Sequence, residues 1–190
     1  MTKQLHLTIC LILVAAITQG CSPAAVKGNG EEPAKFQERP VSEPYWKDLK
    51  IETRAIDLIY DQVKVYMHVN VTSFNGNVLL SGEVPDENTR TEIGKIVSGV
   101  EGVRHLNNEL AVAENSSLVS RSNDSLITSS VKLRFVRDSR FNAGDIRVVT
   151  ENGVVFLMGR AKRAEADAAA DIASTTSRVK RVVKLFEYTD

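Results

Sequence analysis

The stretch TENGVVFLMG, from Thr150 to Gly159, has a near copy earlier in the chain, TSFNGNVLLSG, from Thr72 to Gly82. Asn-Gly is the dipeptide that best tolerates positive φ at both central positions of a type I′ turn, and apolar residues alternate on both sides of it. Each copy therefore predicts a β-hairpin. The matched apolar positions keep one constant offset: Val69, Val71, Val78 and Leu80 correspond to Ile146, Val148, Val155 and Leu157. A repeat of this kind indicates two copies of one small domain.

The elements around each hairpin follow one order. A helix is predicted over residues 50–61 before the first hairpin and over 126–137 before the second. After each hairpin, apolar residues at the i, i+3, i+4, i+7 spacing predict a second helix with one buried face. That face comprises Ile93, Ile96, Val97 and Val100 in the first copy and Ala169, Ile172, Ala173 and Thr176 in the second. A last strand follows in each copy. The predicted fold class is α+β: two tandem domains, each α-β-β-α-β, with two helices packed on a three-stranded sheet.

The segment 1–20 is typical of an export signal. Lys3 precedes a nearly continuous apolar run that is too short to span a bilayer but suits the h-region of a secretory signal. The run ends in ITQGCS, which resembles the lipobox of bacterial lipoproteins, with Thr18 where an aliphatic residue is usual. We expect Cys21 to be the lipidated first residue of the mature chain; cleavage by an ordinary signal peptidase is the alternative. Ser22, the residue that follows Cys21, resembles the residue found at this position in lipoproteins that are sorted to the outer membrane.

The rest of the chain divides by composition. Residues 21–47 carry four of the five prolines and are predicted to be a flexible tether. The predicted domains are 48–113 and 125–190, joined by a polar linker at 114–124. At the end of that linker, Asn123-Asp124-Ser125 supplies cap residues for the helix predicted to follow. Tyr45 and Trp46, at the end of the tether, are expected to pack onto the first domain.

The element order and the Asn-Gly hairpins resemble the BON domain, a small module of bacterial envelope proteins. The match is densest at VVTENGVVFLMG, AEADAAADIAS and VKRVVKLF, and it extends in outline over the whole chain. The resemblance is to dual-BON outer-membrane lipoproteins. It implies a protein that faces the periplasm, is needed for envelope integrity, binds anionic phospholipid through its second domain and acts at division sites. It also implies no catalytic activity.

Charge is divided unequally between the two predicted domains. Residues 48–112 hold 6 basic and 10 acidic residues, whereas 125–190 hold 12 and 8. The balanced total of 24 basic and 24 acidic residues therefore hides a negative first domain and a positive second one. A positive domain is suited to anionic headgroups.

The helix predicted over 126–137 carries the candidate lipid site. Ile127, Val131 and Phe135 share one side and should face the sheet, while Leu126 and Leu133 lie on the opposite side. Apolar anchors beside basic residues suit a helix that lies on an anionic membrane surface. The candidate phospholipid-binding residues are Leu126, Lys132, Leu133, Arg134 and Arg137. Two alternatives remain open: Leu126 and Leu133 cover the other domain, or their exposure is incidental.

The resemblance places a Trp at the position of Leu126. Leucine keeps apolar area but lacks the interfacial preference of an indole ring. We therefore expect phospholipid binding that is retained but weaker.

Residues suited to catalysis are scarce. The sequence holds no Cys/His metal spacing, no Gly-rich phosphate loop and no nucleophile-base arrangement, so we expect no catalytic residue, cofactor or metal site. His68 and His105 are interpreted as surface residues. The expected partners are anionic phospholipids such as phosphatidylglycerol, and no nucleic acid. The competing hypothesis is a protein-interaction adaptor in which these leucines or the acidic first domain bind an envelope partner, for instance the outer-membrane assembly machinery.

Overall fold

A computed structural model describes residues 43–65 and 67–190 of the chain. All of them belong to one compact unit, Pro40–Asp190. The expected signal sequence, Cys21 and most of the expected tether lie outside the described residues.

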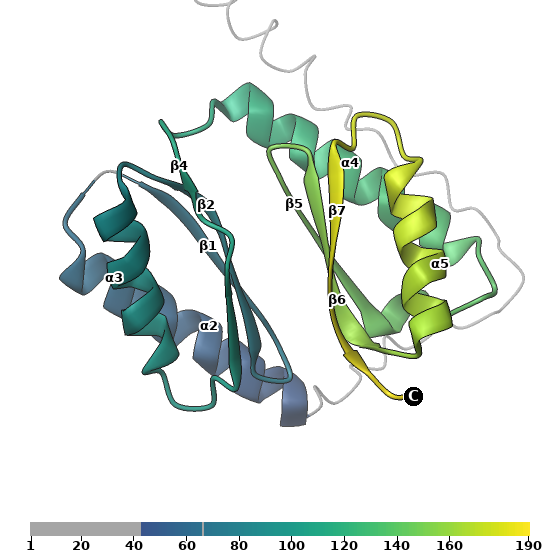
Figure 1. The fold of residues 1–190 in the computed structure, drawn as a ribbon, viewed down its shortest axis with the longest axis horizontal. Helices are drawn as coiled ribbons and strands as arrows, with labels where there is room; N and C mark the ends of the chain where they lie inside the picture. Colours follow the sequence, from purple (N-terminus) through teal and green to yellow (C-terminus); the bar gives the residue numbers. More distant parts are fainter. Residues whose placement is uncertain (1–42, 66) are drawn as a thin grey trace, which may run out of the picture. The chain divides into compact units, whose positions relative to one another are not determined.

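The first domain has the predicted order of helices and strands (Figure 1). Strand β1 runs antiparallel to β2, and β2 runs parallel to both β3 and β4. The two short strands share one edge of β2 because residues 109–110 interrupt the predicted last strand, where Leu110 turns into the core. The predicted three-stranded sheet is therefore four-stranded here. The elements are α2 (Glu43–Gln62), β1 (His68–Phe74), β2 (Asn77–Val84), α3 (Glu87–Ser98), β3 (His105–Asn108) and β4 (Ala111–Val112).

The second domain repeats this plan with an uninterrupted third strand (Figure 1). Strands β5 and β6 are antiparallel, and β6 and β7 are parallel. A short 3₁₀ turn, η1 (Ala143–Asp145), precedes the sheet. The other elements are α4 (Leu118–Val136), β5 (Ile146–Glu151), β6 (Val154–Ala161), α5 (Arg163–Ser174) and β7 (Arg181–Tyr188).

The two Asn-Gly turns have the predicted backbone. The angle φ is positive at both Asn75 and Gly76, and again at Asn152 and Gly153, as a type I′ turn requires. Each turn is also bound by a buried carboxylate. Asp124 accepts the N–H groups of Asn152 and Gly153 at 2.9 and 2.8 Å, and Asp48 accepts those of the first turn.

Two helices begin earlier than predicted. Helix α4 starts at Leu118, where the Ser117 hydroxyl accepts the Ser120 N–H. The prediction of Asp124 as a cap residue was therefore wrong: it lies inside the helix and holds the hairpin. Helix α2 starts at Glu43, so the last residues of the predicted tether, 43–47, are helical.

The predicted core faces are confirmed. In α4, Ile127, Val131 and Phe135 are buried against the second sheet. The predicted faces of α3 and α5 are buried or half-buried throughout: Ile93, Ile96, Val97 and Val100, and Ala169, Ile172, Ala173 and Thr176.

The other face of each sheet is buried as well. Leu79, Phe156 and Met158 form a third apolar cluster, to which strands of both domains contribute. Met158 therefore belongs to the contact between the domains and not to the core of one. Every residue of β2 is buried, which requires cover on both of its faces.

Candidate functional site

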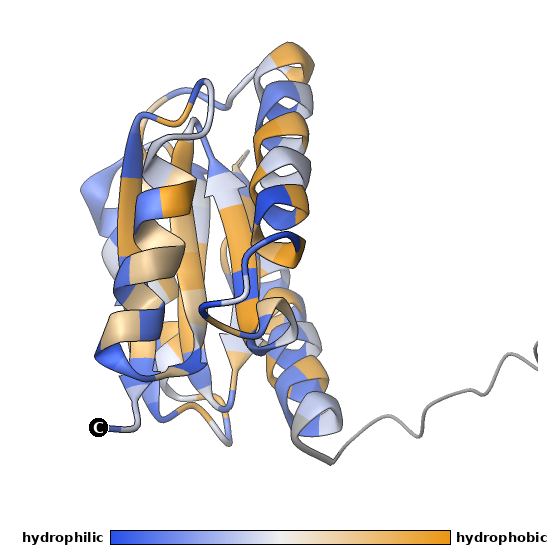
Figure 2. Ribbon diagram, turned by 90° about the vertical axis from the view of Figure 1, so that its right-hand side faces the viewer, coloured by the Kyte–Doolittle hydropathy of each residue, from blue (hydrophilic) through white to orange (hydrophobic). Residues whose placement is uncertain are grey.

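The outward side of α4 carries an unusual number of exposed apolar residues. At about 100° per residue they fall within one stripe, which extends over about 27 Å of helix. In Figure 2, α4 is the helix that reaches highest. Orange, apolar residues recur along it from its first turn to its last. We call this set the α4 stripe: Leu118, Val119, Leu126, Leu133 and Val136.

Four serines near the α4 stripe have hydroxyls that are already bonded. Each donates a hydrogen bond to the backbone carbonyl one turn earlier, at 2.8–3.1 Å. A hydroxyl that is satisfied within its own helix costs less to move out of water than a free one. The four are Ser122, Ser125, Ser129 and Ser130.

The three predicted basic residues of α4 have different surroundings. Lys132 and Arg137 are exposed, and their side chains make no hydrogen bond or ion pair within residues 43–65 and 67–190. The Arg134 guanidinium instead donates to the Ile172 carbonyl and the Thr176 hydroxyl, both at 2.7 Å. It therefore ties α4 to the end of α5 and is not free for a headgroup in this conformation.

The structure decides between two of the alternatives for the leucines. Leu126 is 57% exposed and Leu133 is 62% exposed within the unit that contains both domains. They do not cover the first domain, because the contact between the domains is made by the sheets. The alternative of a domain interface at these leucines is therefore wrong.

One side of the contact between the sheets is polar. His68 on β1, Glu83 on β2 and Glu151 on β5 place their ligand-type atoms within 4.8 Å of one another, and we call them the His68–Glu83–Glu151 cluster. The His68 side chain is only 20% exposed, so its interpretation as a surface residue was wrong. His105, in contrast, is exposed as expected. The Asn70 amide donates to Glu151 Oε2 at 3.0 Å and lies 3.2 Å from His68 Nε2.

Burial changes the acidity of this cluster. Desolvation raises the pKa of Glu151 from 4.5 to about 7, and the nearby charges of Glu83 and Asp124 act in the same direction. Desolvation also lowers the pKa of His68, with a further contribution from Arg121. Both groups are thus driven toward their neutral forms.

Charged contacts also join the domains elsewhere. Arg147 on β5 binds Glu52 at 3.1 Å and donates to the Ser73 carbonyl at 2.9 Å. Arg104 pairs with Glu187 at 3.1 Å. The first pair joins a basic group of the second domain to an acidic group of the first, and the second pair joins the domains in the opposite sense.

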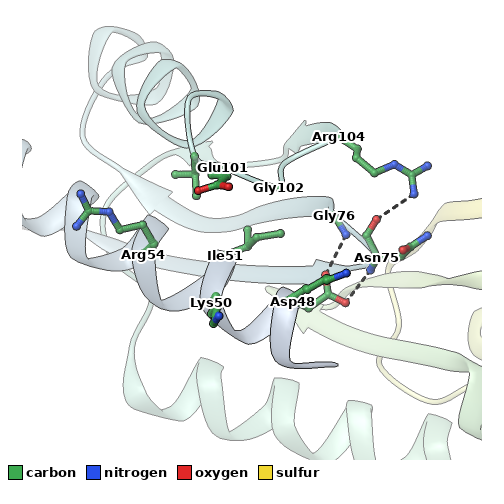
Figure 3. Close-up of a pocket in the computed structure, with 11 residues that line it drawn as sticks. Asp48, Lys50, Ile51, Arg54, Asn75, Gly76, Glu101, Gly102 and Arg104 are labelled. Atoms are coloured by element: carbon green, nitrogen blue, oxygen red, sulfur yellow. Dashed lines mark hydrogen bonds between the residues drawn. The ribbon is translucent and has the colours of Figure 1, made fainter. Parts of the chain in front are cut away.

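A groove of about 590 Å³ lies beside the first hairpin (Figure 3). Lys50, Arg54 and Arg104 contribute positive charge and Glu101 opposes it. Asp48, also in the groove, is committed to the Asn75-Gly76 turn, so both of its oxygens are already in use.

The first helix has an exposed aromatic surface that sequence reasoning missed. Tyr45 and Trp46 are about half exposed, so their expected packing onto the first domain was wrong. Leu49 and Tyr60 fall on the same side of α2, and we call these four residues the α2 patch. The signal was available in the spacing of 45, 46, 49 and 60, but the helix was predicted to begin only at residue 50.

The model of the BON domain matches residues 51–114 and again residues 123–190. The chain belongs to the BON family. Its relatives include the outer membrane lipoprotein DolP of Haemophilus influenzae, 38% identical over 96% of both chains. The 21 kDa hemolysin of Actinobacillus pleuropneumoniae is 36% identical over 67% of this chain and 66% of its own, and the osmotically-inducible protein Y of Escherichia coli is 30% identical over 70% and 66%. Within the described residues of this BON protein, no helix is long and apolar enough to cross a membrane.

Proposed function

We propose that this BON protein is a non-catalytic outer-membrane lipoprotein that faces the periplasm, anchored through Cys21. Its second domain binds anionic phospholipid along the α4 stripe and supports outer-membrane integrity, at division sites. The name of the H. influenzae relative and the GCS sequence at Cys21 support the anchor.

The observation that carries the lipid contact is the α4 stripe itself. Exposed leucines and valines along a surface helix have no folding role, since the opposite face of α4 already packs against the sheet. Lys132 and Arg137 flank the stripe, and within the described part of the chain their charges are free for lipid phosphates. The domain's excess of 12 basic over 8 acidic residues favours the same surface.

A lipid-anchored protein needs no second contact merely to stay at the membrane. Docking of α4 therefore has to serve another purpose. We propose that it selects membrane regions by lipid composition or curvature, which a simple anchor does not do.

Flotation of residues 40–190 on liposomes tests this function. The fragment starts before Glu43 so that α2 stays whole. We expect it to float with vesicles containing phosphatidylglycerol and not with purely phosphatidylcholine vesicles. Flotation should fall steeply between about 0.05 and 0.5 M salt, because screening weakens contacts between exposed charges. Failure to float under any of these conditions would leave the acyl anchor as the only membrane contact.

The second candidate function is a periplasmic adaptor for an envelope assembly complex. The α2 patch favours it, because exposed aromatic residues on a domain with 6 basic and 10 acidic residues suit a protein partner better than anionic lipid. An apolar protein contact of this kind should persist at high salt, whereas docking of α4 on anionic lipid should not.

A further inference from the structure

We propose that His68, Glu83 and Glu151 form a divalent-cation site, suited to Zn²⁺, that joins the two BON domains. The three residues come from three strands and both domains, and their ligand-type atoms already lie within 4.8 Å of one another. Donors around a zinc ion at about 2.1 Å lie roughly 3.4 Å apart, so small side-chain movements suffice to close the site.

An unpartnered buried oxygen points to a ligand here. Glu83 is only 4% exposed, yet its Oε2 has no hydrogen-bond partner among the described residues. Ser81 lies two residues away on the same face of β2, opposite Asn70 on β1, and its buried hydroxyl also has no partner in that part of the chain. Buried polar atoms are normally bonded. A bound cation would give Glu83 Oε2 the partner that it lacks among the described residues.

The charges around the cluster favour a cation. Glu83 and Glu151 are two buried carboxylates in close proximity, with Asp124 nearby, and Arg121 is the cation that acts on both His68 and Glu151. A divalent ion bound between these side chains would offset the negative charge of the two carboxylates.

The donor set selects the type of metal. One imidazole nitrogen with two carboxylate oxygens suits zinc and related transition metals, whereas Mg²⁺ and Ca²⁺ favour oxygen ligands alone. Open space borders the cluster on two sides. A hollow of about 410 Å³ is lined by His68 and Glu151, and another of about 350 Å³ by Glu83 and Glu151. An ion therefore has a path from solvent.

The test is zinc binding to the full chain in detergent, prepared without a polyhistidine tag and stripped with EDTA. Isothermal titration should give one Zn²⁺ per chain, undisturbed by millimolar Mg²⁺. His68→Gln, Glu83→Gln and Glu151→Gln should each weaken binding at least tenfold, and zinc should raise the Tm of the parent protein but not of these variants. His105→Gln is the matched control and should bind as the parent does, since His105 is exposed and outside the cluster.

Glutamine preserves the approximate size of each side chain, and far-UV circular dichroism confirms that each variant is folded. Zinc binding of equal affinity in the parent and in folded His68→Gln would overturn the site. So would the absence of binding to the parent chain at millimolar zinc. These results concern the domain interface and leave the proposed docking of α4 on lipid untouched.

Discussion

Two buried aspartates each hold an Asn-Gly turn against the preceding helix. Asp124 uses both carboxylate oxygens for the N–H groups of Asn152 and Gly153, and Asp48 does the same in the first domain. Hydrogen bonds to a charged acceptor are worth more than neutral ones. These side chains therefore fix where each hairpin lies on its helix.

We predict that Asp124→Asn lowers the free energy of unfolding by about 2 kcal/mol, because the amide keeps only one acceptor and loses the charge. Urea denaturation of residues 40–190 measures this value. Asp171→Asn is the control, since Asp171 is exposed. Replacing Asp171 should change the free energy of unfolding by only a small fraction of that amount, because substitutions of exposed residues usually have small effects. Equal stability of the two variants would contradict the role given to Asp124.

The raised pKa of Glu151 predicts a pH dependence. The folded state holds the Glu151 proton up to about pH 7 and the unfolded state only to about 4.5, so the contribution to stability is complete below pH 4.5 and is lost as pH rises through 7. In EDTA, Glu151→Gln should therefore match the parent below pH 4.5 and exceed its stability by up to about 3 kcal/mol above pH 7. The lowered pKa of His68 makes stability increase as pH rises, which is the opposite trend. This contribution is present in both the parent and Glu151→Gln and does not affect their difference. A difference that does not vary with pH would refute the assignment.

At the scale of elements, the sequence predicted the hairpins and the buried helix faces because turn chemistry and apolar period act locally. It missed the first turns of α2 and α4. Those turns, around Tyr45 and Leu118, have no buried apolar period, since their apolar residues face outward. The early start of α4 enlarges the candidate site, because it extends the exposed pair Leu126 and Leu133 into a stripe along the whole helix.

The two matched glycines bring the hairpin strands close together. A Cβ on Gly82, whose φ is positive, would lie 2.0 Å from the His68 carbonyl oxygen, and one on Gly159 would lie 2.3 Å from that of Asp145. We predict that Gly159→Ala lowers stability by more than about 2 kcal/mol in thermal denaturation, because a backbone atom has to move. Gly144→Ala, whose Cβ meets nothing closer than 3.4 Å, should change stability little. Equal melting of both variants would rule out the steric explanation.

At the scale of the whole described unit, the sheets are buried on both faces. The continuous apolar run VVFLMG at 154–159 was the signal, since a strand with one wet face should alternate. Sequence reasoning used only the half of this run that faces the helices. It could not place His68 beside Glu151, because only the pairing of two domains brings them together. It also could not show that Arg134 is held by α5.

The shared cluster of Leu79, Phe156 and Met158 predicts that residues 40–190 unfold as one unit. Calorimetry should give a single transition for the parent fragment. Met158→Asp places a charge in this cluster and should separate the transition into two, because each domain keeps its own core. Two transitions in the parent fragment would show that the domains unfold independently.

Flotation of Leu126→Glu/Leu133→Glu in residues 40–190 tests whether the α4 stripe docks on anionic lipid. Both leucines face solvent, so the substitution should leave folding intact. We predict that the fraction of this variant that floats with phosphatidylglycerol vesicles is at least tenfold lower than for the parent. Tyr60→Glu, on the α2 patch, should float like the parent. Unchanged flotation of the double variant would show that the α4 stripe is not the lipid contact, and loss in Tyr60→Glu alone would assign that contact to the first domain.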